Sequence, residues 1–291
     1  MYENEIIRLG DSEPLLGNQM ASNAWVIHGN YTKSGLPLLA SDPHLKNDIP
    51  ATWILNELMW EDKYVIGGTA AGMPFVQIGR TESFAWGCSA TRIDNSDIWE
   101  EEVNDDFTKY LVDGEWREIK KITEKIKVKG GDDIDFVIGF THRGPLIELN
   151  LLKGGAEVLF LKGSPKVDNK AYYSVAFAGT YIPGDDNMKA LSLFANAESV
   201  KKHFHALDEI GKDGFNGLNQ NLIFADKYGD IAYYLTAPIP VRKDKTPYIG
   251  CRVLDGRRSE FDWEPGKLAP ITELPRAINP KKGYILTANN R

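Results

Sequence analysis

Few residues in this sequence have a type and spacing that could carry out chemistry. A serine precedes an asparagine at Ser22, a histidine follows a proline at His44, and two carboxylates stand three positions apart at Asp94 and Asp97. A serine hydroxyl can act as a nucleophile beside a base, an imidazole can orient that hydroxyl, and carboxylates suit a hard cation. Taken alone, each pattern is more typical of a turn or a solvated loop. The elements around these residues must therefore decide what they do.

Two familiar kinds of site are absent from the sequence. Cys88 and Cys251 are too few for a disulfide framework, and neither stands in a metal-binding spacing such as C-x-x-C. No G-x-S-x-G pattern is present, which excludes a serine hydrolase of the nucleophile-elbow type. The two cysteines leave the redox compartment open.

The composition is that of a globular protein with an acidic balance. The 34 Lys and Arg against 41 Asp and Glu leave a formal net charge of −7, and no run of basic residues offers a surface for phosphates. No apolar stretch approaches the roughly 20 residues of a membrane-spanning helix. The first twenty residues are acidic and have no apolar core, so they do not read as a secretory signal peptide. We expect neither nucleic acid nor a membrane as partner, and the localisation stays open.

Short strands are the main elements expected to position these residues. They are predicted at residues 24–28, 38–41, 76–79, 84–89, 122–128, 134–140, 158–161, 172–177, 221–225, 231–236 and 284–288. Turns rich in Gly and Asp at 113–114, 130–133 and 227–230 separate several of them. Residues 53–60 fit a helix by propensity or a buried strand by length, and we favour the strand.

One helix stands out, at residues 198–210. Its apolar residues recur at helical spacing, Asn196 could cap its start, and Gly211 could end it. The predicted fold class is therefore α+β, rich in sheet and poor in helix. Asp42, Asp226 and His142 are expected to be structural residues, because polar loop side chains usually bond nearby backbone.

Several motifs occur in an order and spacing that resemble the β subunit of the penicillin acylase family. The motifs are Met20-Ala21-Ser22-Asn23-Ala24-Trp25-Val26-Ile27, Leu39-Ala40-Ser41-Asp42-Pro43-His44-Leu45, Gly72-Met73-Pro74-Phe75-Val76-Gln77-Ile78-Gly79, Phe84-Ala85-Trp86-Gly87, Thr141-His142-Arg143-Gly144-Pro145, Gln220-Asn221 through Phe224-Ala225-Asp226, and Asn279-Pro280 through Ala288-Asn289-Asn290-Arg291. No single motif would carry the resemblance, but the series covers nearly all of residues 22–291.

The resemblance implies an N-terminal-nucleophile hydrolase with a four-layer αββα sandwich, incomplete in this chain. Residues 22–291 would form the β-subunit-like domain, and residues 1–21 would be the end of the linker before the nucleophile. In this family autocatalytic cleavage, here between Ala21 and Ser22, leaves a serine at a new N-terminus. The freed α-amine, with a pKa of about 8, then serves as base for the hydroxyl of the same residue.

The resemblance also implies the other site residues. His44 matches the position that orients the nucleophile and its amine. The amide of Ala90, or of its neighbour Thr91, and the side chain of Asn289 match the donors for the oxyanion of the tetrahedral intermediate. Trp53, together with other aromatic residues that would ordinarily be core (Trp60, Phe75, Phe84 and Trp86), could line an acyl pocket.

A structural calcium ion is a further expectation of the resemblance. Asp94, Ser96 and Asp97 match a calcium-holding segment, and the carbonyl of Pro240 matches another ligand. Oxygen donors of this kind suit calcium. The same D-x-x-D spacing is common on solvated loops, so both interpretations stay open at this point.

The function implied is hydrolysis of a linear amide C–N bond in a small acylated molecule, through an acyl ester on Ser22. The alternative is a catalytically inactive family member, or a subunit or interaction domain. Family members continue on both sides of the matched region, so the chain could be one polypeptide of a split enzyme, a truncated product or a reduced member. In each case we expect an apolar sheet face that binds another acylase segment or self-associates.

Overall fold

The structure is a computed structural model, and it describes residues 21–45, 49–148, 171–181, 186–217, 219–246 and 249–289. These residues form two compact units. The Trp99 unit contains the described residues of Asp94–Tyr181 and Pro240–Lys267, and the Ser22 unit contains those up to Ile93, within Ile182–Ile239 and from Leu268 onward. Each unit is described by itself below.

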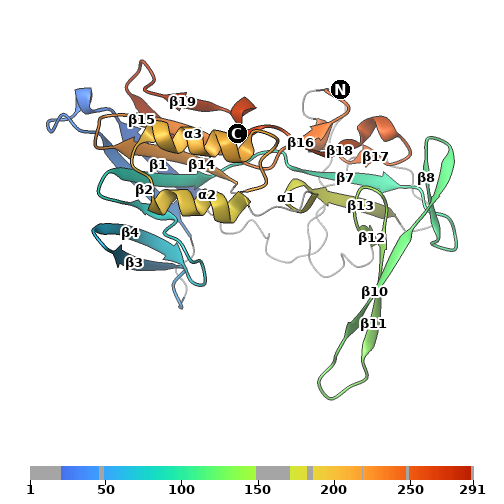
Figure 1. Cartoon of the computed structure of the whole chain (residues 1–291). Coiled ribbons are helices and arrows are strands. Elements are labelled where there is room, and N and C mark those ends of the chain that lie inside the picture. Colours follow the sequence, from blue (N-terminus) through green and yellow to red (C-terminus); the bar gives the residue numbers. More distant parts are fainter. Residues whose placement is uncertain are drawn as a thin grey trace. The chain divides into compact units, whose positions relative to one another are not determined.

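The Ser22 unit contains two sheets and two helices (Figure 1). Its elements are β1 (Ala21–Ile27), β2 (Leu38–His44), β3 (Trp53–Trp60), β4 (Lys63–Ala70), β5 (Ile78–Arg80), β6 (Phe84–Ala90), α2 (Asp186–Ala195), α3 (Val200–Gly211), β14 (Gln220–Asp226), β15 (Ile231–Thr236), β19 (Arg276–Ile278) and β20 (Tyr284–Thr287). One sheet has the strand order β2-β1-β20, and the other has the order β19-β15-β14-β6-β5-β4-β3. All pairings described in both sheets are antiparallel.

Alternation along β1 explains how the two sheets pack. Ser22, Ala24 and Val26 are buried, whereas Asn23 and Trp25 are exposed. Because successive side chains of a strand point to opposite faces, the buried set forms one face of the strand. Ala24 and Val26 share a core with residues of the larger sheet and of β20, namely Ile223, Ala225, Ile231 and Ile285. Ser22 therefore lies on the inner face of the smaller sheet.

Helices α2 and α3 cover the other face of the seven-stranded sheet (Figure 1). Phe194 of α2 stacks on Trp86 of β6, with ring centroids 5.1 Å apart, and Phe204 of α3 packs edge-on against Tyr234 of β15. The unit thus has three layers in the order helices, large sheet, small sheet. In the described part of the chain no helix covers the outer face of the small sheet, so the expected fourth layer is not seen there.

The two sheets approach closely at Gly87 of β6. A Cβ atom at this position would lie 2.5 Å from the Cβ atom of Ser41 in β2, a distance that no real side chain tolerates. The absence of a side chain lets the Ser41 hydroxyl accept a hydrogen bond from the Cys88 amide at 3.1 Å. Gly87 therefore sets the spacing of the sheets directly beside the residues that follow in β6.

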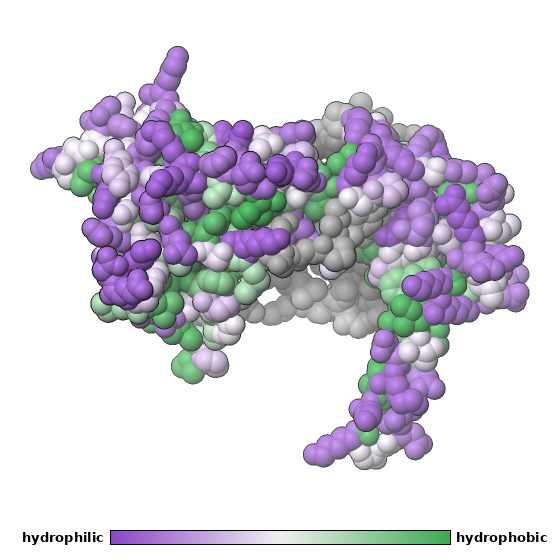
Figure 2. All heavy atoms as spheres, viewed as in Figure 1, coloured by the Kyte–Doolittle hydropathy of each residue, from purple (hydrophilic) through white to green (hydrophobic). Residues whose placement is uncertain are grey.

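The Trp99 unit is built from strands around a four-stranded sheet of order β12-β13-β7-β17. Its elements are β7 (Ser96–Glu101), β8 (Lys109–Val112), β9 (Glu115–Glu118), β10 (Lys120–Ile126), β11 (Ile134–Phe140), β12 (Leu146–Glu148), β13 (Tyr172–Phe177), α1 (Ala178–Tyr181), β16 (Pro240–Arg242), β17 (Leu254–Asp255) and β18 (Trp263–Leu268). The rings of Trp99 and Trp263 meet edge-on, with centroids 5.9 Å apart. Figure 2 shows the β10–β11 hairpin as an arm of mixed hydrophobic and hydrophilic residues.

Most sequence-based strand predictions are confirmed, and the predicted helix is shifted. Residues 53–60 form strand β3, as favoured, and the expected strand 158–161 lies outside the described residues. The helix predicted at 198–210 is α3, and it begins after Ser199, whose hydroxyl accepts from the Lys202 amide at 3.4 Å. Asn196 is therefore not its cap, and Gly211 lies inside its last turn. No helix in the described part of the chain is long and apolar enough to cross a membrane.

Candidate active site

Ser22 lies at the N-terminal end of β1, where both its hydroxyl and its backbone nitrogen donate hydrogen bonds. The residue is 9% exposed, and its hydroxyl donates to the carbonyl oxygen of the preceding residue, Ala21, at 2.7 Å. Its backbone nitrogen donates to Oδ1 of Asn289 at 2.6 Å. The hydroxyl of Ser22 therefore lies beside the peptide bond that cleavage would break. The nitrogen of Ser22 is bonded to Asn289, which is 267 residues away in the sequence.

Asn289 connects Ser22 to the end of β6. It follows β20, and its backbone has a φ of 57°, a left-handed conformation that asparagine adopts more readily than most residues. While Oδ1 accepts from Ser22, Nδ2 donates to the carbonyl oxygen of Ala90 at 2.6 Å. Three residues that the resemblance places in one site are thus close together. They are Ser22 in β1, Ala90 at the end of β6 and Asn289 after β20.

A hydrogen-bond network from β14, β15 and β20 holds the C-terminal end of β6. Asn221 of β14 donates through Nδ2 to the Ala90 carbonyl and to the Ser89 hydroxyl, both at 3.3 Å, and accepts from the Tyr233 hydroxyl at 2.8 Å. Ser89 also bonds the hydroxyl of Thr287 at 2.7 Å. Burial raises the pKa of Tyr233, so this phenol stays a neutral donor. All these groups are uncharged, and they hold the last residue of β6 rigidly.

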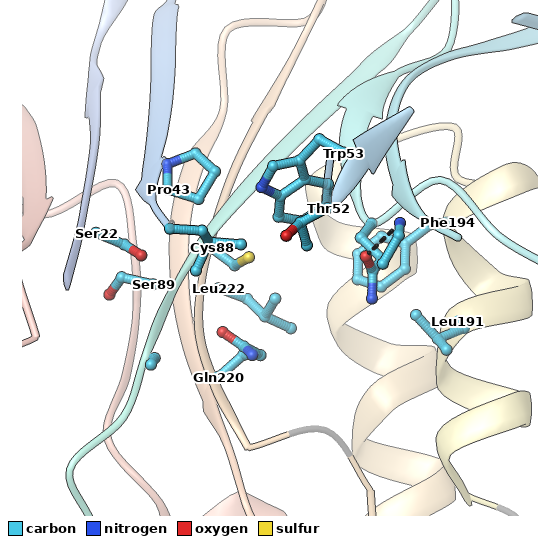
Figure 3. Close-up of a pocket in the computed structure, with 14 residues that line it drawn as sticks. Ser22, Pro43, Thr52, Trp53, Cys88, Ser89, Leu191, Phe194, Gln220 and Leu222 are labelled. Atoms are coloured by element: carbon cyan, nitrogen blue, oxygen red, sulfur yellow. Dashed lines mark hydrogen bonds between the residues drawn. The ribbon is translucent and has the colours of Figure 1, made fainter. Parts of the chain in front are cut away.

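A cavity of about 280 Å³ opens beside Ser22 (Figure 3). It is lined by Ser22, Pro43, Leu45, Thr52, Trp53, Ala70, Gln77, Cys88, Ser89, Ala90, Leu191, Phe194, Gln220 and Leu222. None of these side chains is charged at neutral pH. The Cys88 thiol among them stays neutral because burial raises its pKa to about 12. A small, mostly apolar cavity with a few polar groups is typical of a small-molecule site.

His44 is placed differently from its expected role. Ser22 pairs with Pro43 across β1 and β2, whereas His44 pairs with Ala21, so strand alternation turns His44 to the face opposite Ser22. The hydrogen bond described for His44 Nε2 goes to Asp42 Oδ2, at 2.8 Å. The structure therefore corrects the expected contact with the Ser22 hydroxyl: His44 is a half-exposed partner of Asp42, on the same face of β2.

The residues proposed to hold calcium lie in the Trp99 unit, and a cation is already among them. The guanidinium of Arg242 donates to Asp97 Oδ2 at 2.7 Å and to Asp94 Oδ1 at 2.9 Å. Gly250 packs on this cluster, since a Cβ atom there would lie 2.3 Å from an Asp94 oxygen. Described residues also include no group of three or more His, Cys, Asp or Glu able to hold a metal. As arranged, the residues do not fit a calcium ion, which would have to displace Arg242.

Two further predictions concern a structural role for Asp226 and a pocket role for five aromatic residues. Asp226 is structural, as predicted: it accepts from the Val200 amide at 2.9 Å at the start of α3 and from the Asp230 amide at 3.0 Å. Of the five aromatic residues suggested for a pocket, only Trp53 lines the cavity. Phe84 and Trp86 are buried in the core, and Trp60 and Phe75 pack against it.

The sequence analysis missed the helix that closes the cavity. Leu191 and Phe194 of α2 line it from the side opposite Ser22 (Figure 3). Met188, Leu191 and Phe194 recur every three residues, a spacing typical of one helix face, and that signal could have indicated α2. Gln77, Cys88 and Gln220 carry no sequence signal of a pocket, because their side chains converge only through the pairing of the large sheet.

Comparison with known proteins decides the family. The family model described as penicillin amidase matches residues 3–291. The chain belongs to the penicillin amidase family. The fold agrees, since a thermostable penicillin G acylase from Alcaligenes faecalis superimposes with a TM-score of 0.67 at 22% identity, covering 92% of this chain and 44% of the other.

Among curated relatives of this penicillin amidase family member, the acyl-homoserine lactone acylase QuiP of Pseudomonas aeruginosa is 29% identical over 93% of the chain. The penicillin acylase 2 proenzyme of a Pseudomonas species is 28% identical over 97% of it, and the penicillin G acylase of Escherichia coli is 25% identical over 97%. The matched regions cover 30%, 33% and 30% of these relatives, so the chain spans about a third of their length. The family supports amide hydrolysis in general.

Proposed function

We propose that this chain carries the catalytic serine of an acylase that hydrolyses the amide bond of a small, uncharged acyl group. The observation that supports this most directly is the placement of Ser22, with its hydroxyl 2.7 Å from the Ala21 carbonyl oxygen and its nitrogen 2.6 Å from Asn289 Oδ1, on the wall of an apolar cavity.

The first step in this proposal is cleavage of the bond between Ala21 and Ser22. The Ser22 Oγ attacks the carbonyl carbon of Ala21, the C–N bond breaks as an ester forms, and water hydrolyses the ester to leave the Ala21 carboxylate and a free α-amine. The hydroxyl needs to lie beside this carbonyl before it can attack, and the observed hydrogen bond keeps it there.

The α-amine then acts on the hydroxyl of the same residue. Asn289 Oδ1 already accepts from the Ser22 nitrogen, so it would hold the neutral amine in place while it takes the hydroxyl proton. Attack of Oγ on an acyl amide gives an oxyanion, the amine leaving group departs with a proton, and water hydrolyses the acyl ester. Nδ2 of Asn289 and the Ala90 amide are the proposed oxyanion donors, and Nδ2 would exchange its bond with the Ala90 carbonyl for one with the oxyanion.

The cavity indicates the size and charge of the acyl group. At about 280 Å³ it lies near the lower end of the roughly 300–1,000 Å³ range of ligand pockets. Pro43, Leu191, Phe194 and Leu222 offer apolar contact, and no charged side chain is among its lining residues. A short aliphatic or phenylacetyl group fits these walls better than a charged one.

Intact mass spectrometry of the purified chain tests the first step. We expect two products that separate between Ala21 and Ser22, and a single uncut chain for Ser22→Ala. Ser41→Ala is a matched control, because Ser41 is a nearby strand serine whose hydroxyl, among the described residues, bonds the Cys88 backbone. A cut at another position, or an unchanged cut in Ser22→Ala, would contradict the proposed nucleophile.

Hydrolysis of hexanoyl and phenylacetyl p-nitroanilides tests the second step. We expect Ser22-dependent release of p-nitroaniline from the assembly that contains the cleaved chain. Cleavage without any hydrolysis would favour the alternative, a family member that keeps the fold as a subunit or interaction domain.

A further inference from the structure

Trp53 places an unused hydrogen-bond donor in the wall of the cavity. Its indole nitrogen is buried and has no hydrogen-bond partner in the described part of the chain. An indole N–H can only donate, and a buried donor without a partner loses its hydrogen bond to water without gaining another. Such groups are rare in folded proteins, and one that borders a cavity can be satisfied by an acceptor on a bound molecule.

The Trp53 ring packs against the neighbouring strand. Trp53 begins β3, and its six-membered ring packs over Gly68 of the paired strand β4, where a Cβ atom would lie 3.4 Å from the ring. In Figure 3 the indole nitrogen lies on the side of the ring turned to Pro43, Cys88 and Ser22. The donor therefore faces the part of the cavity beside the nucleophile candidate.

Two polar groups of the cavity wall, on Gln77 and Ser89, are engaged elsewhere. Gln77 Oε1 accepts from the Ala70 amide at 3.1 Å, and the Ser89 hydroxyl bonds Thr287 at 2.7 Å. The Cys88 thiol is neutral, because burial raises its pKa to about 12. Against mostly apolar walls, the Trp53 N–H is a buried donor without a partner in the described residues, which suits one neutral oxygen better than a charged group.

We propose that Trp53 is a specificity residue that donates a hydrogen bond to an ether, keto or hydroxyl oxygen on an otherwise apolar acyl chain. This inference rests on the proposed function in one respect only: it takes the cavity as the acyl site. With this hydrogen bond, Trp53 distinguishes acyl groups of equal size by the position of one acceptor atom along the acyl chain.

Four isosteric acyl groups test the proposal. Hexanoyl, propoxyacetyl, 3-ethoxypropanoyl and 4-methoxybutanoyl p-nitroanilides have equal chain lengths, and the three ethers place an oxygen at the third, fourth or fifth position. We expect one ether to exceed the other two in kcat/KM by about fivefold in the wild type, the effect of one net hydrogen bond of about 1 kcal/mol. Trp53→Phe should abolish that preference.

The comparison is made within each variant, so the smaller size of phenylalanine affects all four substrates alike. Trp60→Phe is the matched control, because Trp60 ends the same strand and packs against the core without lining the cavity. It should keep the preference for one ether. Equal rates for the three ethers in the wild type, or an unchanged preference in Trp53→Phe, would overturn the proposal.

A binding measurement separates this inference from the proposed hydrolysis. In ¹⁵N-labelled Ser22→Ala protein, the indole N–H resonance that disappears in Trp53→Phe should move on addition of the preferred ether as its primary amide, and much less with hexanamide. A shift without turnover in the Ser22-containing protein would support Trp53 and contradict hydrolysis. Hydrolysis without any selective shift would contradict Trp53.

Discussion

The Trp99 unit and the Ser22 unit use buried polar groups in opposite ways. In the Trp99 unit, Arg143 donates to Glu101 through Nη1 at 2.9 Å and to Asp262 through Nε at 2.6 Å, and all three side chains are at least nine-tenths buried. Its guanidinium also lies over the Trp99 ring, at 5.6 Å. In the Ser22 unit, the groups around Ser22 are hydroxyls, amides and carbonyls, and the cavity beside them has no charged lining.

The difference sets a cluster of paired charges in the Trp99 unit against a cluster of neutral dipoles in the Ser22 unit. Burial alone would raise the pKa of Asp262, but the hydrogen bond from His142 and the charge of Arg143 outweigh it and lower that pKa. The charged groups of Arg143, Glu101 and Asp262 therefore pair with one another. Neutral dipoles around Ser22 leave no fixed anion to repel a developing oxyanion, and they border space where a substrate can bind.

The largest expected effect is on the stability of the Trp99 unit. Arg143→Met should lower the free energy of unfolding by about 3–5 kcal/mol, because it removes the cation paired with buried Glu101 and leaves Asp262 with the more distant Lys243, at 3.6 Å. Urea unfolding measures this. Arg257→Met is the control: its ion pair with Asp255 is half-exposed, and its loss should change stability by less than about 1 kcal/mol. Similar losses in both variants would remove the distinction between the clusters.

The second effect falls on turnover. Asn289→Ala should lower kcat by about 100- to 1,000-fold, as loss of one oxyanion donor does. Asn279→Ala is a close control, since Asn279 also has a positive φ, of 45°, and also bridges two groups, accepting from the Ile231 amide and donating to Asp230. We expect Asn279→Ala to lose stability and keep its rate per folded molecule. A normal rate in Asn289→Ala would remove this residue from the site.

A third effect concerns the cation beside Asp94 and Asp97. Arg242→Ala should lower the free energy of unfolding by about 2 kcal/mol, between the values for buried and surface pairs, because Asp97 is buried and Asp94 is partly exposed. In the wild type we expect neither millimolar calcium nor EDTA to shift the melting temperature. A calcium-dependent rise in the wild type would restore the calcium site expected from the sequence.

A fourth effect is the acid sensitivity of the Ser22 unit. His203 of α3 packs among Phe84, Phe194 and Phe224, and burial lowers its pKa to about 3. Between about pH 6.5 and 3 the unfolded chain binds this proton and the folded chain does not, so stability falls with pH by about 1.4 kcal/mol per unit.

Urea unfolding at several pH values checks this slope. His203→Leu should show a shallower slope below pH 6.5, and His205→Leu, an exposed position on the same helix, should leave it unchanged. Equal slopes in the wild type and His203→Leu would mean that the imidazole is not kept neutral by its aromatic surroundings.

The sequence predicted local elements better than the cavity they form. Strands 134–140, 172–177 and 231–236 were placed with their observed bounds, because alternation or continuous apolar runs mark them. Strand β4 was missed because Gly67 and Gly68 interrupt its pattern. The resemblance brought Ser22, Ala90 and Asn289 together, but the face of His44 depends on the pairing of β1 with β2, which spacing alone does not fix.

Strand β3 carries one wall of the cavity, and its place at the edge of the large sheet has a kinetic consequence. In the described part of the chain it is bonded only to β4, and its side chains at Leu55 and Met59 are largely exposed. Separation of this one ladder opens the wall that holds Trp53 while the helices and the central strands stay in place. Opening of a single edge strand requires less free energy than global unfolding. We therefore expect the amides of β3 to exchange hydrogen faster than those of the central strand β14.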